Sequence, residues 1–282
     1  ALFSPRSIAV VGATDSPQRI GGIPLDYLLR FGYTGRLHAV NPRAATVQGL
    51  PAHARLTDIP EPVDLAIVAV PQAHVAAVLE DAAAARVRSM VLFSSGFAET
   101  GAEGAAAQQA LQERARAAGI RLIGPNCLGF MRPGHQTYAT FSPAPNAGRV
   151  KPGRIGLISQ SGAFGAYAYS MARERGLGLS LWATTGNEAD VQLADGLAWL
   201  ARDPLSSPLD DEVFPAVALA REAGRQRVAA DGGGELGEQR AHGRAVRLRG
   251  EPGVHLGVAA DGEHRQPARS QPRVRAMGGD EL

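Results

Sequence analysis

Short apolar runs alternate with longer stretches of helical composition along the first part of the chain. Each apolar run has the length of one strand, and the runs lie at 7–11, 37–40, 64–70, 89–93 and 121–123. Runs that are apolar throughout are typical of parallel strands buried on both faces. Stretches of helical composition lie at 24–30, 74–86 and 103–118. The alternation predicts an α/β protein whose first domain is a Rossmann-like, doubly wound parallel sheet.

A second series of strands and helices begins near residue 150. Apolar runs at 155–158 and 178–184 are each followed by a polar turn and a helical stretch, at 163–175 and 191–202. Lys151–Gly153 in front of the first run predicts a linker. We therefore expect a second α/β domain.

The composition changes towards the C-terminal end. From Arg225 onward the chain is rich in Gly, Arg, Ala and Glu and has no aromatic residue and no isoleucine. Such a segment buries too little apolar surface to offset the entropy of ordering it. We expect domains at 1–148 and 149–204, the second of them incomplete, and an atypical tail at 205–282 that is disordered or translated out of frame.

Composition and charge exclude several classes of protein. No run approaches the 18 apolar residues of a membrane span, and the N-terminal residues lack the pattern of a signal peptide. One cysteine excludes an internal disulfide and favours a reducing, cytoplasmic compartment. No Cys/His cluster has metal-ligand spacing, so no metal site is expected. The net charge of +2 does not indicate a nucleic-acid partner.

A glycine-rich loop follows the first predicted strand and leads into the first predicted helix. It runs from Gly12 to Gly22. A strand, a glycine-rich loop and a helix are the parts that dinucleotide and CoA folds use to bind phosphate. The spacing differs from Gly-x-Gly-x-x-Gly, and the longer loop leaves room for a bulkier group or another angle of approach.

The end of the second predicted strand argues against NAD. An NAD site would usually have Asp or Glu there, whereas this chain has Asn41, Pro42 and Arg43. Arg43 offers a positive group for a phosphate such as the 3′-phosphate of CoA. The alternative is an ordinary solvated arginine in a loop.

Ser159-Gln160-Ser161-Gly162 joins a predicted strand to a predicted helix in the second domain. The first N–H groups of a helix have no internal partner and favour an anion, so the turn predicts a phosphate site. The alternative is that Ser159 or Ser161 is only the N-cap of the helix. Asn187, in the turn after the next strand, could position a phosphate or a catalytic side chain.

Five motifs stand in a fixed order along residues 2 to about 204. They are Val-Val-Gly-Ala-Thr-Asp with Ile-Gly-Gly (10–22), Val-Asn-Pro (40–42), Gly-Pro-Asn-Cys-Leu-Gly (124–129), Ile-Ser-Gln-Ser-Gly-Ala (158–163) and Thr-Gly-Asn-Glu-Ala-Asp (185–190). The ordered set resembles the CoA-binding and ligase part of the NDP-forming (ADP-forming) acyl-CoA synthetases. These are relatives of the succinyl-CoA synthetase alpha subunit, and the resemblance implies that the second domain is flavodoxin-like.

The resemblance implies a reversible reaction of a small carboxylic acid, CoA and a nucleoside triphosphate. The products are acyl-CoA, nucleoside diphosphate and phosphate, and a phosphohistidine carries the phosphoryl group. It implies coenzyme A as the cofactor of this chain, and an ATP-grasp domain or subunit, absent here, that brings ATP/ADP and Mg. We also expect an oligomer. The implied phosphate site is formed by Ser159, Ser161, Gly162 and Asn187.

The implied CoA site consists of residues from five loops that follow predicted strands. They are Gly12, Thr14, Ser16, Gln18, Gly21, Gly22, Asn41, Pro42, Arg43, Val70, Pro71, Ser94, Ser95, Gly96, Pro125, Asn126 and Cys127. Without a base near it in the sequence, Cys127 is expected to be a small buried side chain and not a nucleophile.

The chain departs from the family after Asp203-Pro204, where a Glu and a catalytic His would follow. His242 is a weak candidate for the phosphoryl carrier because its surroundings lack the family pattern. The catalytic residue is thus unknown, and this chain alone would bind CoA without relaying phosphate. The alternative function is a non-catalytic CoA or acyl-CoA sensor, of the kind fused to protein acetyltransferases.

Overall fold

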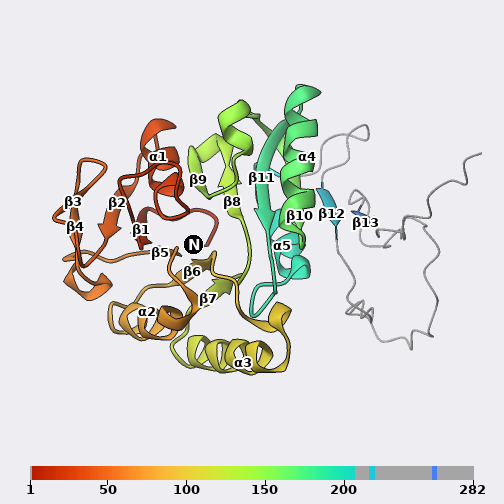
Figure 1. Cartoon of the computed structure of the whole chain (residues 1–282). Coiled ribbons are helices and arrows are strands. Elements are labelled where there is room, and N and C mark those ends of the chain that lie inside the picture. Colours follow the sequence, from red (N-terminus) through yellow and green to blue (C-terminus); the bar gives the residue numbers. More distant parts are fainter. Residues whose placement is uncertain (1, 207–215, 220–255, 259–282) are drawn as a thin grey trace, which may run out of the picture.

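The computed structural model describes residues 2–206, 216–219 and 256–258, and it contains two sheets (Figure 1). The first sheet has the order β3-β4-β2-β1-β5-β6-β7. Its strands are β1 (Ser7–Val11), β2 (Arg36–Val40), β3 (Thr46–Val47), β4 (Leu50–His53), β5 (Leu65–Val68), β6 (Ser89–Leu92) and β7 (Arg121–Ile123). All neighbours are parallel except the hairpin of β3 and β4.

Helices cover both faces of the first sheet. They are α1 (Ile23–Arg30) on one face, and α2 (Gln72–Ala84) and α3 (Ala102–Ala117) on the other (Figure 1). Alternate side chains of β1 point to opposite faces. Ile8 packs in the cluster that contains Leu25 of α1, whereas Ala9 packs in the cluster that contains Leu79 of α2. The predicted doubly wound sheet is confirmed.

The second sheet has the order β13-β12-β10-β11-β8-β9. Its strands are β8 (Gly129–Arg132), β9 (Thr137–Thr140), β10 (Lys151–Ser159), β11 (Gly178–Thr184), β12 (Ala216–Leu219) and β13 (Leu256–Val258). Strands β10 to β13 are parallel, and the β8–β9 hairpin runs antiparallel to β11. Helices α4 (Gly162–Glu174) and α5 (Leu193–Leu200) follow β10 and β11.

Four short 3₁₀ helices lie in the connections. They are η1 (Leu56–Asp58), η2 (Ala98–Thr100), η3 (Pro133–His135) and η4 (Ala144–Ala147). Within the described residues no helix is long and apolar enough to cross a membrane.

Three features of the second sheet differ from the expectations. The predicted linker Lys151–Gly153 is instead the first part of β10, because the parallel pairing with β11 extends to Lys151 and Pro152, which lie opposite Gly178 and Leu179. The hairpin β8–β9 adds a stretch of the predicted first domain, 1–148, to this sheet. The segments β12 and β13 form strands within the predicted tail, 205–282, whose other residues beyond 206 lie outside the described part. The domain boundaries themselves remain predictions.

The N-terminal segment ties the first sheet to the second. The Phe3 ring contacts those of Phe130 and Trp199, with centroids 5.2 and 4.9 Å apart. Arg132 forms a buried ion pair with Asp203 at 2.8 Å and also donates to the Ser4 hydroxyl. The Arg132–Asp203 pair lies within the part of the chain that contains the second sheet, so the contacts that link the N-terminal segment to it are those of Phe3 and Ser4.

Candidate functional site

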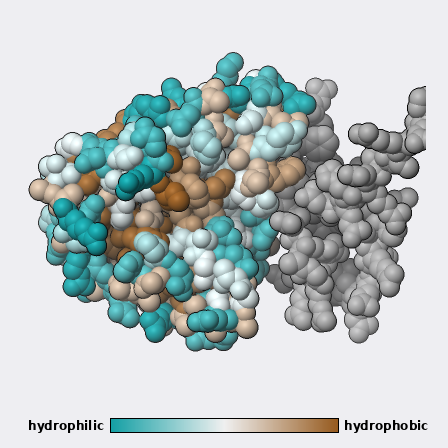
Figure 2. All heavy atoms as spheres, in the orientation of Figure 1, coloured by the Kyte–Doolittle hydropathy of each residue, from teal (hydrophilic) through white to brown (hydrophobic). Residues whose placement is uncertain are grey.

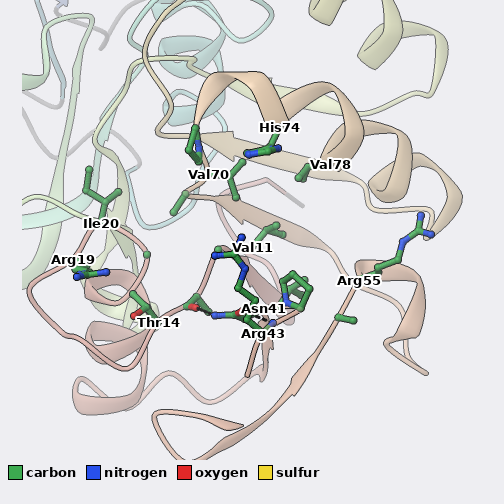
Figure 3. Close-up of a pocket in the computed structure, with 18 of the residues that line it drawn as sticks. Val11, Thr14, Arg19, Ile20, Asn41, Arg43, Arg55, Val70, His74 and Val78 are labelled. Carbon is green, nitrogen blue, oxygen red and sulfur yellow. Dashed lines mark hydrogen bonds between the residues drawn. The ribbon is translucent and has the colours of Figure 1, made fainter. Parts of the chain in front are cut away.

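A cavity of about 1080 Å³ opens at the carboxyl edge of the first sheet, where β1, β2 and β5 end (Figure 3). This edge is where ligands bind in doubly wound sheets. Its walls are the loop after β1, the turn after β2 and one face of α2. Over this region Figure 2 shows hydrophobic atoms in a hollow with hydrophilic atoms around it. Val11, Val40, Val70 and Val78 supply apolar lining.

Close backbone approaches shape the glycine-rich loop. Gly12 has φ +83°, a left-handed conformation that costs glycine little, and a Cβ there would lie 2.6 Å from the carbonyl oxygen of Ala69. A Cβ at Gly21 would collide with the carbonyl oxygen of Gly12. The Gln48 side-chain amide clamps the loop, since Nε2 donates to the carbonyls of Thr14 and Gly22 at 2.9 and 3.0 Å. Side chains larger than hydrogen would therefore disrupt the wall of the cavity.

Asn41 joins the turn after β2 to the same loop. Its Nδ2 donates to the carbonyl of Ala13 at 2.9 Å, and its Oδ1 accepts from the backbone N–H of Arg43 at 2.8 Å. In an NAD site, an acidic side chain at this position would bind the ribose. Here the Asn41 side chain bonds to the protein backbone instead. The Arg43 side chain is exposed at the cavity and forms no ion pair with any carboxylate of the described residues.

Nine of the residues predicted for CoA line this cavity. They are Gly12, Thr14, Gln18, Gly21, Asn41, Pro42, Arg43, Val70 and Pro71. Sequence reasoning missed Arg19, Ile20, Arg55, His74 and Asp81, which also line it. His74, Ala77, Val78 and Asp81 recur at helical spacing from Pro71, a signal that could have identified the α2 wall.

Eight other predicted CoA residues do not line the cavity. They are Ser16, Gly22, Ser94, Ser95, Gly96, Pro125, Asn126 and Cys127. The last six follow β6 and β7 at the same edge of the sheet. Ser94 donates from its hydroxyl to the carbonyl of Val70 at 2.7 Å, and the backbone N–H of Asn126 donates to the carbonyl of Ser94 at 2.9 Å. Ser94 thus holds Val70 of the cavity wall, and Asn126 in turn holds Ser94.

Cys127 is a buried side chain, as the sequence analysis expected. It is 2% exposed, and its thiol lies 3.4 Å from the carbonyl oxygen of Leu92. Burial raises the pKa of the Cys127 thiol to about 12. The thiolate, which is the reactive form, is therefore not populated near neutral pH.

The predicted phosphate residues gather at the carboxyl edge of the second sheet. Ser159 ends β10, Ser161 and Gly162 begin α4, and Asn187 follows β11. The Ser159 hydroxyl is fully buried and donates to the carbonyl of Ser161 at 2.8 Å. The Ser161 hydroxyl accepts from the N–H of Phe164 at 3.4 Å, so Ser161 is an N-cap. The Ser159 proton is therefore used within the turn, whereas Ser161 Oγ accepts a bond and its own proton has no partner among the described residues.

Asn187 connects this edge to the first sheet. Its Nδ2 donates to Gln108 at 3.0 Å and to the carboxylate of Glu99, and its Oδ1 accepts from Asn126 at 3.3 Å. The Glu99 carboxylate also accepts from the N–H groups of Gly96 and Phe97. Burial alone would raise the pKa of Glu99, but the bonds from Asn187 and the backbone outweigh it and lower the pKa. The two edges thus share one hydrogen-bond network.

Two parts of the chain match models of known protein families. Residues 6–133 match the model of a CoA binding domain, and residues 152–208 match that of a succinyl-CoA ligase like flavodoxin domain. The chain belongs to the NDP-forming acyl-CoA synthetase family. The alpha subunit of ADP-forming acetate–CoA ligase I from Pyrococcus furiosus is 36% identical over 207 residues, which are 72% of this chain and 44% of the relative.

Other members of the family show the same partial overlap. ADP-forming acetate–CoA ligase I of Archaeoglobus fulgidus is 38% identical over 72% of this chain and 29% of its own length. The apo structure of acetyl-coenzyme A synthetase 1 from Ca. Korarchaeum cryptofilum superposes with a TM-score of 0.71 at 33% identity, covering 80% of this chain and 46% of that one. The chain therefore spans less than half the length of these relatives.

Two features bear on the chemistry of a synthetase. His242, the weak candidate for the phosphoryl carrier, lies outside the described residues. In the described part of the chain no group of three His, Cys, Asp or Glu side chains could hold a metal ion.

Proposed function

We propose that this chain is the CoA-binding and ligase part of an acid–thiol ligase that forms acyl-CoA from CoA and a small carboxylic acid. The observation that carries the proposal is the cavity at Gly12–Gly21, in which Arg43 stands next to Asn41 where an NAD site would have an acidic residue. The reaction is coupled to conversion of a nucleoside triphosphate to the diphosphate and phosphate, as the family resemblance implies.

The residues of the cavity fit the chemistry of CoA. The glycine loop exposes backbone to a diphosphate that must approach closely, because no side chain can stand at Gly12 or Gly21. The valine-lined surface suits the adenine ring and the pantetheine arm. The free guanidinium of Arg43 suits a phosphate monoester.

The second-sheet edge is proposed as the phosphate site, formed by Ser159, Ser161, Gly162 and Asn187. Since Ser159 already donates within the turn, the donors left for an anion are the Ser161 hydroxyl proton and the first backbone N–H groups of α4. Ser159 then acts by shaping the turn.

An ATP-grasp domain or subunit is proposed to supply the nucleotide site and Mg²⁺. The relatives from ADP-forming acetate–CoA ligases I and II of Pyrococcus furiosus are named alpha subunits, and this chain covers 44% and 42% of their lengths. We further propose a cytoplasmic oligomer as the working enzyme.

Isothermal titration of the full 282-residue chain with CoA, and with NAD as the control ligand, tests the proposal. We expect CoA to bind and NAD to give no heat. Arg43→Ala should weaken CoA binding about tenfold or more, the effect of one charge-assisted hydrogen bond. Arg116→Ala, which removes an exposed arginine of α3 outside the cavity, should leave CoA binding unchanged.

Binding of NAD without CoA would contradict the proposal. The chain could also bind CoA but produce no acyl-CoA when combined with its ATP-grasp partner. That result would favour the alternative function, a non-catalytic sensor of CoA or acyl-CoA.

A further inference from the structure

A second cavity, of about 500 Å³, lies at the edge of the first sheet where β1 and β2 begin. Its volume is within the range of small-molecule sites. Because the five residues of β1 span about 16 Å, this cavity and the Gly12 loop lie at opposite ends of the strand. We call it the amino-edge cavity, and its polar lining includes Ser4, Arg6, Thr34, Arg36, His135 and Thr137.

The amino-edge cavity is lined from both sheets. Arg6 directly precedes β1 and Arg36 begins β2, and the N–H of Arg36 donates to the carbonyl of Arg6 at 2.9 Å. On the other side, His135 ends η3 and Thr137 begins β9 of the second sheet. The Thr137 hydroxyl donates to the carbonyl of His135 at 3.2 Å. A ligand in this cavity would therefore contact both parts of the molecule.

The charges at the amino-edge cavity are positive. Among the described residues, two arginines line it and no Asp or Glu does. Arg36 pairs at 2.7 Å with Glu61, which is not part of the lining. Within the described part of the chain Arg6 forms no ion pair, and its hydrogen bonds, to Asp64 and Arg36, are made by its backbone. The Arg6 guanidinium is therefore available for an anion.

Ser4 and His135 add neutral donors to the lining. The Ser4 hydroxyl oxygen accepts from Arg132, which is 3% exposed and pairs with Asp203. Among the described residues the Ser4 proton itself has no acceptor, so it is left for a ligand. Partial burial, and then the charge of Arg132, lower the pKa of His135. Near neutral pH the His135 ring is thus mostly neutral and donates one N–H.

We infer that the amino-edge cavity binds a small molecule that carries a phosphate group, and that this ligand links the two sheets. Phosphate oxygens accept hydrogen bonds from guanidinium and hydroxyl donors, and a phosphate dianion is attracted by a lining that holds arginine and no described carboxylate. Arg6 is the principal binding residue. The inference goes beyond the proposed function, since it concerns the other edge of the first sheet and none of the residues proposed for CoA.

Inorganic pyrophosphate is the probe, and two imidazole rings report where it binds. The full 282-residue chain carries carbon-13-labelled histidine, and the Cε1–H signals of His135 and His74 are assigned with His135→Gln and His74→Gln. His135 lines the amino-edge cavity and His74 lines the cavity at the other edge. We expect pyrophosphate to shift the His135 signal saturably. Sodium chloride of equal ionic strength should not shift it.

Arg6→Ala removes the guanidinium and none of the described hydrogen bonds, because Arg6 bonds through its backbone. It should weaken the binding seen at His135 about tenfold or more, the effect of one charge-assisted hydrogen bond, and leave the His74 response unchanged. Arg88→Ala is the matched control. Arg88 is an exposed arginine in front of β6 at the same edge, 3.9 Å from Asp64 and outside the cavity. It should keep the affinity within about twofold of wild type.

Four results would overturn the inference. The His135 signal could stay in place with pyrophosphate, or shift equally with sodium chloride. Arg6→Ala could bind as tightly as wild type. Arg88→Ala could lose as much affinity as Arg6→Ala, which would mean that the general charge of this edge attracts the probe. None of these measurements uses CoA, so failure of this inference and failure of the proposed function are distinguishable.

Discussion

The carboxyl edges of the two sheets are built from the same local parts but leave different groups free. At the first edge the Gly12–Gly21 loop and the Arg43 turn surround a cavity, and the Arg43 guanidinium has no carboxylate partner in the described region. At the second edge the hydroxyls of Ser159 and Ser161 bond within their own turn. The Asn187 side chain bonds to the first domain.

The difference shows that a strand, a polar turn and a helix do not by themselves make a side-chain binding site. Whether such a turn can bind a ligand depends on which hydrogen-bond donors the surrounding structure leaves without partners. The first edge surrounds a cavity with side chains and backbone, whereas the second edge offers the start of α4 and the Ser161 hydroxyl proton. The predictions that follow test this contrast.

The largest expected effect is at the first edge. Gly21→Ala places a Cβ against the backbone carbonyl of Gly12, so it should abolish measurable CoA binding, a loss of about a hundredfold or more, and lower stability by roughly 1–3 kcal/mol. Calorimetric titration and thermal unfolding measure both effects. Gly134→Ala is the control, because a Cβ there lies 3.9 Å from its nearest neighbours. Unchanged CoA affinity in Gly21→Ala would contradict the claim that the tightly packed loop binds CoA.

An intermediate effect on stability, with none on CoA affinity, is expected at the second edge. Ser161→Ala removes the N-cap of α4 and should lower the free energy of unfolding by about 1 kcal/mol. Ser170→Ala is the matched control within α4, since Ser170 only donates to the carbonyl of Ala166 and alanine is the better helix former. Urea unfolding distinguishes the two. A large drop in CoA affinity for Ser161→Ala would contradict the proposed difference between the two edges.

The smallest expected effect is at the network that joins the edges. The pKa of Glu99 is lowered in the folded protein, so its ionised form stabilises the fold above the ordinary carboxyl pKa, and this contribution disappears as pH falls through the lowered value. Because Glu99 is exposed, Glu99→Gln should cost less than about 1 kcal/mol at pH 7. The difference from wild type should shrink as the pH falls through the lowered pKa of Glu99 and vanish below it. A difference that persists in acid would refute the charge-based explanation.

The sequence predicted the parts of the site whose signals are local. The Gly12–Gly22 loop and Asn41–Arg43 each follow an apolar run directly, so their place at the sheet edge could be inferred from the chain alone. Arg55 and Asp81, which form an ion pair at 2.9 Å, could not be found in this way. Their pairing depends on strand β4, whose sequence Leu-Pro-Ala-His is a poor strand pattern, and on which face of α2 meets the cavity.

The fold shows the same limit. The β8–β9 hairpin joins the second sheet although its residues precede the predicted linker, because strand neighbours are chosen by tertiary packing and not by order in the chain. The sequence allows Ser161 to be a phosphate donor or an N-cap, and the bond from the Phe164 N–H establishes the N-cap.

Hydrogen exchange of the full chain with and without saturating CoA tests the central claim most directly. The account predicts slower exchange in peptides that cover 11–22, 40–44 and 70–78 and little change at 159–163. NAD should give no protection. Protection confined to 159–163, or equal protection by NAD, would contradict the assignment of the first-sheet cavity as the CoA site.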